Sequence, residues 1–464
     1  MSEPVIVWIR NDLRLEDHPA LNAAASENRA VIPVYLWTPE AEGEWPRGAA
    51  SRWWLHHALE DFDKSLRGIG SRLVLRRGSD PEKLLGELLE ETGAAQIYWN
   101  RRYDPVGVKT DTALKKRFPA KSFRGNVLFE PHQIQTQSGE FYKVFTPFYR
   151  NVQGLGDPPD PLEAPKGLQA PDRWPESDSL ENWKLLPEIP WDVDFYTHWK
   201  PTAAGAAAQA EDFLDEAAGV YKEARDFPAR PGTSRLSPFL HFGQLSSRLL
   251  WHQAREATEQ GSSANGMEAW TRQLVWRDFA THLLFHQPQL DLEPMQEKFR
   301  AFPWEKNAEK LKAWQEGRTG YPIVDAGMRE LWHTGWMHNR VRMIVASFLV
   351  KDLLLPWQDG ARWFWDTLVD ADLANNSFGW QWAAGCGADA APYFRIFNPE
   401  LQSKKFDAEG TYIKKWVPEL NHLDPREVHA PPASRLPKGY PPPIVDHKLA
   451  RDKALEALHT ISVS

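Results

Sequence analysis

Residues 5–37 read VIVWIRNDLRLEDHPALNAAASENRAVIPVYLW, and this stretch contains the alternation that decides the fold. Two short runs rich in β-branched and aromatic residues, Val5–Arg10 and Val31–Trp37, are typical of buried strands. The segment between them, Leu21–Asn28, has the spacing of an amphipathic helix. A strand, a helix and a second strand in this order predict the first unit of a parallel sheet.

The same alternation continues through the next ninety residues or so. Further strands are predicted at Leu73–Arg76 and Gln96–Trp99, with helices at Ala49–Leu66, Pro81–Thr92 and Pro105–Phe118. A doubly wound sheet of this kind binds ligands at the carboxyl ends of its strands. The first strand, however, leads into RNDLRLEDHP and not into a Gly-rich turn, so we do not expect a dinucleotide there. The charges of this segment equally describe a salt-linked loop.

The composition changes after the sheet. Prolines recur from Gly154 to Pro201 and predict an extended connector. Beyond Ala203 the chain is predicted to be helical, with helices at Ala203–Arg225, Ser246–Glu259, Met267–His286, Ala308–Glu316, Asp325–Gly335, Asn339–Leu355, Asp359–Leu368 and Asp446–His459. We therefore predict an α/β plus all-α protein: an N-terminal doubly wound, Rossmann-like parallel sheet without the Gly-rich motif, then a helical domain. The expected boundaries are 1–130, 131–202 for the connector and 203–464.

The length, net charge and composition of the chain restrict the class of protein. The chain has 464 residues and a mass of 53.2 kDa, so we expect two domains. Its net charge of −8 and pI near 6.0 argue against a protein that binds nucleic acid over its whole surface. A local basic patch stays compatible with these values. The single cysteine, Cys386, fits a reducing compartment. Charged residues follow the first apolar run at once, unlike a signal peptide, and the apolar run Met343–Val350 is too short to span a bilayer. We expect a cytoplasmic protein with no membrane partner.

Residues 370–399, DADLANNSFGWQWAAGCGADAAPYFRIFNP, concentrate polar and aromatic groups. Asp370 and Asp372 lie one residue apart, two adjacent amides follow, and Trp380 and Trp382 flank a glutamine. Acceptors, amides and aromatic faces in so short a segment suit a planar heteroaromatic ligand. The alternative is a buried helix corner whose polar groups satisfy one another. A divalent metal at the D-x-D pair is not expected, because hard cations prefer more oxygen donors than this segment offers.

The predicted helix Met267–His286 carries a second cluster of polar and aromatic residues. Gln273, Trp276 and Arg277 share one face, with Trp270 one turn earlier. Indoles beside hydrogen-bonding groups suit a base held outside its stack, whereas the alternative is an interfacial helix with a snorkelling arginine.

Two further segments carry weaker signals. Asn339 and Met343 lie one turn apart beside Arg340 and Arg342, and paired arginines suit phosphate. The hydroxyls and backbone N–H groups of Thr233–Ser237 make a candidate phosphate cradle. Alone, each segment is equally a basic helix start or an ordinary polar loop.

Together these residues resemble the photolyase/cryptochrome family of flavoproteins, along nearly the whole chain. The resemblance is carried by five segments in order: RNDLRLEDHPAL (10–21), FPARPGTSRLSP (227–238), QLVWRDF (273–279), GYPIVDAGMRELWHTGWMHNRVRMIVASFLVKDLL (320–354) and the stretch 370–399. Within the family, the sequence is similar to a bacterial cyclobutane pyrimidine dimer photolyase of the class I/class III type.

The resemblance implies a site, residue by residue. Positions that hold FAD are matched by Tyr221, Thr233, Ser234, Arg235, Leu236, Ser237, Trp270, Arg277, Asp370, Asp372 and Asn376. Asn376 would face flavin N5 and tune the redox states of the flavin. The electron-hopping triad that photoreduces the flavin is matched by Trp380, Trp357 and Trp304. The lesion pocket is matched by Gln273, Trp276, Asn339, Met343 and Trp382, and DNA-contacting positions by Arg225, Arg340, Arg395 and Gln402.

The implied activity is that of a deoxyribodipyrimidine photo-lyase, which splits dimers in DNA by light-driven electron transfer from reduced FAD and requires no metal. The first domain would carry an antenna chromophore, either methenyltetrahydrofolate or a deazaflavin, since the folate-binding Asn–Glu pair of class I is not evident near Asn100–Lys109. Gln273 stands where class I dimer photolyases usually carry Glu, and Gln also occurs in (6-4) photolyases, while Met343 favours the dimer.

Other functions stay open at this point. A cryptochrome-type blue-light receptor is the main alternative, and the absence of a long tail after residues 439–443 favours repair. A metal-dependent nucleotide-sugar transferase is a remote alternative, based on the D-x-D pair. The expected partner is DNA containing pyrimidine dimers, and the expected state is a monomer.

Overall fold

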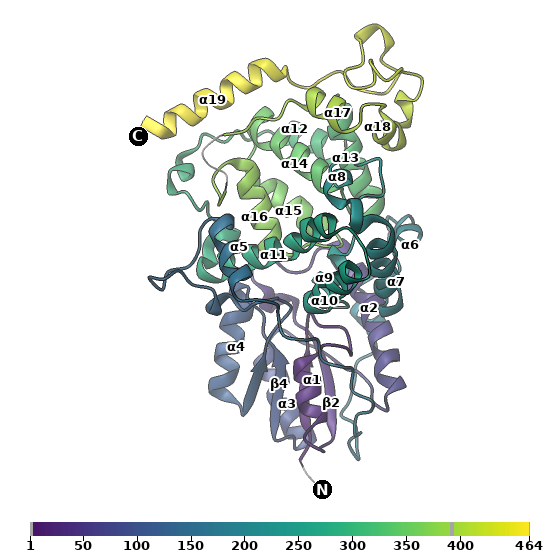
Figure 1. The fold of residues 1–464 in the computed structure, drawn as a ribbon, viewed down its shortest axis with the longest axis vertical. Helices are drawn as coiled ribbons and strands as arrows, with labels where there is room; N and C mark the ends of the chain where they lie inside the picture. The colour runs from purple at the N-terminus through teal and green to yellow at the C-terminus, as the bar shows by residue number, and fades with distance from the viewer. Residues whose placement is uncertain (1–2, 390–393, 464) are drawn as a thin grey trace.

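The computed structural model describes residues 3–389 and 394–463. Figure 1 shows a parallel sheet at the N-terminal end of the molecule and a larger helical part stacked on it. The sheet has five strands in the order β3-β2-β1-β4-β5, and all neighbouring pairs are parallel. The strands are β1 (Val5–Ile9), β2 (Val31–Trp37), β3 (Val74–Arg77), β4 (Gln96–Asn100) and β5 (Ala120–Phe123). The predicted fold class is confirmed.

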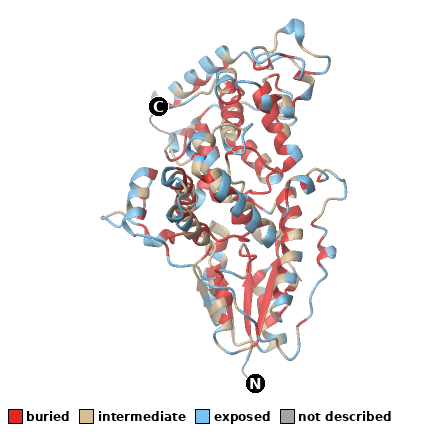
Figure 2. Cartoon of the chain, turned by 45° about the vertical axis from the view of Figure 1, so that its right-hand side comes forward, coloured by how far each residue is buried: buried red, intermediate tan, exposed pale blue. Residues whose placement is uncertain are grey.

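The central strands are buried on both faces, as Figure 2 shows by their red colour. Along β1, Val5, Val7 and Ile9 pack in one hydrophobic cluster with α1 (Pro19–Ala25) and α2 (Ala49–Gly68). Ile6 and Trp8 point to the opposite face, where they pack with leucines of α3 (Pro81–Thr92) and α4 (Pro105–Arg117). The period of two along a strand thus explains why this sheet reads as continuous apolar runs.

The remaining helices form the second part. They are α5 (Phe145–Gly154), α6 (Phe195–His198), α7 (Ala203–Asp212), α8 (Tyr221–Ala224), α9 (Ser237–His241), α10 (Ser247–Glu259), α11 (Ala264–His286), α12 (Ala308–Gln315), α13 (Pro322–Thr334), α14 (Asn339–Ser347), α15 (Trp357–Thr367), α16 (Leu373–Ala384), α17 (Pro399–Phe406), α18 (Thr411–Trp416) and α19 (His447–Val463). None of the helices within the described ranges is both long and apolar enough to cross a lipid bilayer.

Several elements differ from the predicted ones. The expected helix Ala203–Arg225 is interrupted between α7 and α8 by a wide turn and a short 3₁₀ turn, at Gly219 and Val220, which are poor helix formers. The expected helix Asn339–Leu355 ends its regular part at Ser347 and continues as a wide turn. Strand β5 was not predicted, because its sequence AKSF lacks the apolar run of a buried strand.

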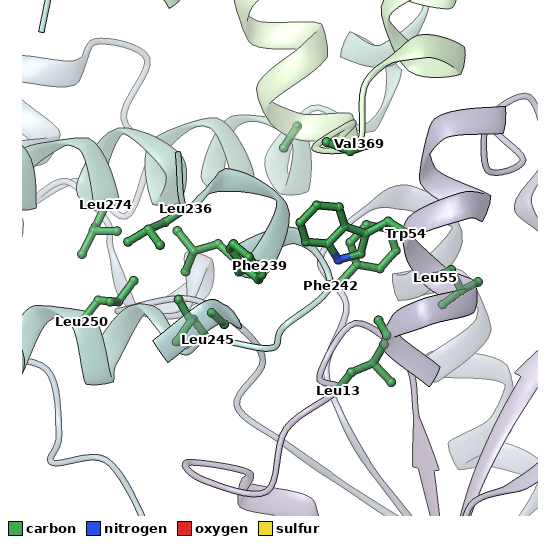
Figure 3. Close-up of a cluster of buried hydrophobic side chains, with 14 of the residues drawn as sticks. Leu13, Trp54, Leu55, Leu236, Phe239, Phe242, Leu245, Leu250, Leu274 and Val369 are labelled. Carbon is green, nitrogen blue, oxygen red and sulfur yellow. The ribbon is translucent and has the colours of Figure 1, made fainter. Parts of the chain in front are cut away.

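A continuous hydrophobic cluster joins the two parts, as the close-up in Figure 3 shows. Trp54 of α2 lies between Phe239 and Phe242, with ring centroids 5.0 and 6.0 Å away. Gly243 follows with a φ of +71°, and a Cβ there would lie 2.0 Å from the backbone oxygen of Asn11. This close approach places the end of α9 directly over the loop after β1. The division at residues 130 and 202 stays a prediction.

Candidate functional site

One cavity of about 580 Å³ opens in the helical part, and we call it the helical cavity. Most of the predicted site residues border it: Tyr221, Arg225, Thr233, Ser234, Arg235, Leu236, Ser237, Trp270, Gln273, Trp276, Arg277, Asn339, Met343, Asp370, Asp372, Asn376, Trp380 and Trp382. They come from α8, the loop before α9, α11, α14 and α16. The structure therefore brings together segments that the sequence separates widely.

Helix α16 supplies the largest share of this wall. Its N-cap is Asp372, whose Oδ1 accepts hydrogen bonds from the backbone N of Asn375 (2.9 Å) and from Asn375 Nδ2 (2.7 Å). Asn376 Nδ2 donates to the backbone oxygen of Ala361 on α15 at 3.0 Å. Trp380 lies one turn later and is buried against Gly360 of α15, where a Cβ would come within 2.1 Å of the indole. Glycine at 360 is thus required for the indole to reach its position.

Asp370 organises the polar side of the cavity. Its Oδ2 accepts hydrogen bonds from Ser237 Oγ (2.6 Å) and from Arg342 Nη2 (2.8 Å). Its Oδ1 is buried and has no hydrogen-bond partner among the described residues. Because a buried carboxylate oxygen without a partner is costly, this atom indicates where a ligand donor belongs.

Asp372 is held ionised by its neighbours. Burial opposes ionisation, but His241 and the charge of Arg277 lower the pKa of Asp372 well below its usual range. His241 Nδ1 lies 3.7 Å from Asp372 Oδ2. Arg277 donates to the backbone oxygens of Asn126 and Leu240, so its charge stays available to the cavity wall. His241 was not predicted, since nothing in its local sequence distinguishes it from a core histidine.

Aromatic rings also border this cavity, and we call them the aromatic wall. Trp276 stacks on Phe145 of α5, with ring centroids 3.4 Å apart and planes 8° apart. Phe378 meets Trp276 at 5.7 Å, and Trp382 packs at 6.4 Å from Phe397. Phe145 was not among the predicted residues, and it covers one face of the indole that borders the cavity.

The predicted DNA-contacting residues are distributed unevenly. Arg225 borders the cavity, and Arg340 lies nearby, where both approach Asp226. Arg340 Nη2 donates to Asp226 Oδ1 at 2.8 Å, whereas Arg225 Nε is 4.0 Å from the same oxygen. Arg395 is exposed and Gln402 is half-buried on α17, and neither borders the cavity. Tyr393, the residue before the described segment 394–463, lies outside the described residues.

Of the three tryptophans assigned to electron transfer, only Trp380 borders the cavity. Trp357 is fully buried at the start of α15, and Trp304 is half-buried against Phe302, with ring centroids 4.3 Å apart. Trp380 and Trp357 are thus both buried and Trp304 is partly exposed, and the order of the three along an electron path stays a prediction.

A second cavity of about 320 Å³ lies at the carboxyl ends of β1 and β4, and we call it the sheet-edge cavity. This is the position where the strand order changes direction, the usual ligand site of an open parallel sheet. Its wall includes Trp45, Arg47, Tyr103 and Trp365. The loop after β1 is salt-linked, as its charges allowed: Arg10 pairs with Asp111 at 2.6 Å.

Comparison with protein-family models gives two matches. A model described as DNA photolyase matches residues 5–166, and one described as the FAD binding domain of DNA photolyase matches residues 270–460. The second match covers the segments that build most of the helical cavity. An FAD-binding domain is therefore present in this chain.

Individual relatives agree along the full length. A deoxyribodipyrimidine photo-lyase of Agrobacterium fabrum is 49% identical over 98% of each chain. A bacterial class III photolyase from Agrobacterium tumefaciens has a structure that superposes with a TM-score of 0.96 at 48% identity, covering 100% of this chain and 98% of that one. Cryptochrome-2 of Arabidopsis thaliana is more distant, at 36% identity over 99% of this chain and 79% of its own length. The chain belongs to the photolyase/cryptochrome family, and the relatives bear out the predicted family and enzyme class.

Proposed function

We propose that this chain is a light-driven DNA repair enzyme that uses FAD to split cyclobutane pyrimidine dimers. The observation that carries this proposal is a single cavity that joins a polar group, Asp370, Asp372 and Asn376, to the aromatic residues Trp276 and Trp382. The polar group suits a redox cofactor and the aromatic residues suit extruded bases. The names of the most similar relatives support the same activity.

The residues of the helical cavity fit FAD. Asp370 Oδ1 and Trp380 Nε1 are buried there without a hydrogen-bond partner among the described residues, and a flavin offers hydrogen-bonding edges to such groups. Thr233–Ser237 would hold the phosphates, with Arg235 fixed between Trp199 and Trp336 at 4.5 and 4.9 Å. Tyr221, Leu236, Trp270 and Arg277 would complete the FAD site.

When bound in its reduced form, FAD supplies a light-driven one-electron donor to the dimer, and the electron returns after the cyclobutane ring opens, so no net oxidation occurs. The chain itself positions the reactants. A hydrogen bond to the Ala361 oxygen fixes Asn376, and hydrogen bonds from Ser237 and Arg342 fix Asp370. Both side chains therefore present hydrogen-bonding groups in fixed positions. Trp380, Trp357 and Trp304 would carry electrons inward to restore the reduced cofactor.

The lesion would be held by the aromatic wall. Trp276 and Trp382 offer faces on which unstacked bases pack, and Asn339 and Met343 lie across the cavity from α11. Gln273 donates from Nε2 to the Ala269 oxygen at 3.0 Å, which leaves its carbonyl oxygen to meet a pyrimidine edge. Arg225, Arg340, Arg395 and Gln402 would contact the backbone of the DNA.

The decisive experiment is an absorption spectrum of the purified protein, followed by illumination with dimer-containing oligothymidine. We expect a bound flavin and the restoration of thymines under blue light. Flavin without repair would favour a receptor, repair of (6-4) photoproducts alone would reassign the lesion, and a colourless protein unable to take up flavin would exclude both.

The sheet-edge cavity is our candidate site for a second chromophore, methenyltetrahydrofolate or a deazaflavin. Its aromatic residues Trp45, Tyr103 and Trp365 suit a planar ring, and its position at the strand ends is the expected one. Absorbance beyond that of FAD, lost when Trp365 is replaced by Ala, would test this assignment.

We further propose a monomer in the cytoplasm. The described residues include one thiol, Cys386, and it is buried, which fits a reducing compartment. Sedimentation at several concentrations tests the monomer, and a concentration-dependent increase in mass would contradict it.

A further inference from the structure

The helical cavity and the sheet-edge cavity share a wall. His241, Arg277 and Asp372 border both cavities. The first turn of α16 continues this division, because Leu373 and Ala374 border the sheet-edge cavity, whereas Asn375 and Asn376 border the helical one. A change in the charges of these shared residues therefore alters the electrostatic potential in both cavities.

The hydrogen bond between Arg47 and His241 has a fixed direction. Arg47 Nη1 lies 3.3 Å from His241 Nε2, and a guanidinium can only donate, so Nε2 accepts. An accepting Nε2 carries no proton, so the ring is neutral with its proton on Nδ1; burial, which lowers the pKa of His241, favours this form and Asp372 opposes it. Nδ1 lies 3.7 Å from Asp372 Oδ2, beyond hydrogen-bond distance, and it has no hydrogen-bond partner among the described residues, so its interaction with Asp372 is electrostatic. Arg47 thus donates to His241, and the protonated nitrogen of His241 is directed towards Asp372.

Arg47 differs from three other arginines of the sheet-edge cavity. Arg10, Arg101 and Arg102 each pair with a carboxylate, at 2.6, 2.7 and 2.8 Å. Arg47 has no carboxylate partner among the described residues: its Nη2 donates to Asn11 Oδ1 at 2.6 Å, and its guanidinium lies 5.2 Å from the ring of Phe242. Arg47 is therefore a cation of this cavity that an anionic ligand group could engage without displacing a carboxylate, whereas the guanidinium of Arg277 is held by the backbone oxygens of Asn126 and Leu240.

We propose that Arg47, His241 and Asp372 couple the two cavities, so that an anionic, planar ligand in the sheet-edge cavity and FAD in the helical cavity change each other's affinity. The inference rests on the proposed function. A ligand that draws the Arg47 guanidinium away removes the donor to Nε2 and its positive field. His241 then interacts differently with Asp372, an acceptor that also borders the helical cavity. Thermodynamic linkage requires the effect to be reciprocal and of equal size.

The test measures FAD dissociation from the FAD-loaded protein by recovery of flavin fluorescence on dilution, with and without saturating methenyltetrahydrofolate. We expect the folate to change the FAD dissociation constant by at least about fivefold in the unmodified chain. Arg47→Met and His241→Phe should each bring this ratio to one. Without folate, Arg47→Met should by itself alter FAD dissociation, although Arg47 does not border the helical cavity.

Val106→Ala is the matched control, because Val106 borders the sheet-edge cavity but not the helical cavity, and it should retain the ratio at saturating folate. A ratio of one in the unmodified chain, or the same ratio in Arg47→Met, would overturn the coupling. If no folate binds, equal FAD dissociation in the unmodified chain and in Arg47→Met overturns it. Failure to bind FAD at all would instead refute the proposed function.

Discussion

Trp380 is the tryptophan of the proposed electron path that borders the helical cavity, and it packs 5.0 Å from Phe364 and 6.1 Å from Trp314. Replacing Trp380 by Phe removes the indole that is oxidised first but keeps an aromatic ring in the packing. We expect light-driven reduction of oxidised flavin to be lost, while repair with chemically reduced flavin is largely retained. Both are measured by absorbance, and an equal loss of the two activities would contradict the electron-transfer role.

Asp226 is a second residue whose effect is local, because it holds Arg340 at 2.8 Å and lies near Arg225. A carboxylate beside two arginines that we propose to bind phosphate would repel the DNA backbone. Replacing Asp226 by Asn should therefore strengthen binding of undamaged duplex by roughly threefold to tenfold, about 1 kcal/mol. Titration at several salt concentrations measures this change.

The control for Asp226 is Asp215→Asn, since Asp215 is exposed and forms no ion pair within the described part of the chain. It makes the same change in net charge away from the arginines. An equal gain in affinity from both substitutions would show that total charge, not the position of Asp226, governs binding.

Between elements, the contact of α5 with α11 is the one that orients the aromatic wall. Phe145 covers one face of Trp276, and its backbone N donates to Asp389 Oδ2 at 2.9 Å, which ties α5 to the segment after α16. Arg272 of α11 lies 5.2 Å from the Phe145 ring and 4.9 Å from Tyr149. The position of the indole therefore depends on three elements that are far apart in the sequence.

Replacing Phe145 by Leu should let the Trp276 indole reorient and weaken binding of dimer-containing DNA by about threefold to tenfold, since an aromatic pair contributes about 0.5–1.5 kcal/mol beyond its buried area. Binding of undamaged DNA should be unchanged, and Phe145→Tyr should restore the lost affinity. Fluorescence anisotropy of labelled damaged and undamaged oligonucleotides measures the difference.

Phe148→Leu provides the matched control for Phe145→Leu. Phe148 is equally buried on α5, and its ring meets Phe145, Tyr142, Phe279 and His282 but makes no ring contact with Trp276 within the described part of the chain. Both substitutions should lower the free energy of unfolding by a similar amount. If Phe148→Leu weakens lesion binding as much as Phe145→Leu does, the effect is one of stability and not of orientation.

Across the whole molecule, Asp278 joins the helical part to the segment that follows the sheet. Its Oδ2 accepts hydrogen bonds from the backbone N of Leu128 (2.8 Å) and Phe129 (3.0 Å). Burial raises the pKa of Asp278 to about 7 in the folded chain, against 3.8 for an unperturbed aspartate. Between these two values the folded state holds a proton that the unfolded state has released, so the contribution of Asp278 to stability falls as pH rises.

Asp278→Asn keeps an acceptor for both amides and cannot ionise. The free energy of unfolding of this variant, relative to the unmodified chain, should therefore rise between pH 5 and pH 8 by an amount on the order of a few kcal/mol. Urea denaturation at both pH values measures it. The variant must be compared with the unmodified chain at each pH, because burial also lowers the pKa of Lys351 to about 7. That shift makes stability rise with pH, which is opposite to the trend caused by Asp278. A pH-independent difference would show that Asp278 is ionised in the folded state.

The strands show which parts of the fold can be predicted from the sequence. Runs such as VIVWI and VIPVYLW are continuous and rich in β-branched residues, so a buried parallel strand is their expected structure. Strand β5, AKSF, lies at the edge of the sheet and is only partly buried, so its position comes from pairing with β4 and not from its composition. The helix break near Gly219 and Val220, in contrast, agrees with local propensity, because both residues are poor helix formers.

The sequence by itself determined the fold class, the family and most residues of the helical cavity, because strand periodicity and ordered motifs are properties of local sequence. Only the tertiary structure placed Arg47 against His241, which lie 194 positions apart, and Phe145 against Trp276. The same holds for the sheet-edge cavity and for the low pKa of Asp372. Contact between distant segments depends on how whole elements pack, and no local pattern records which side chains that packing brings together.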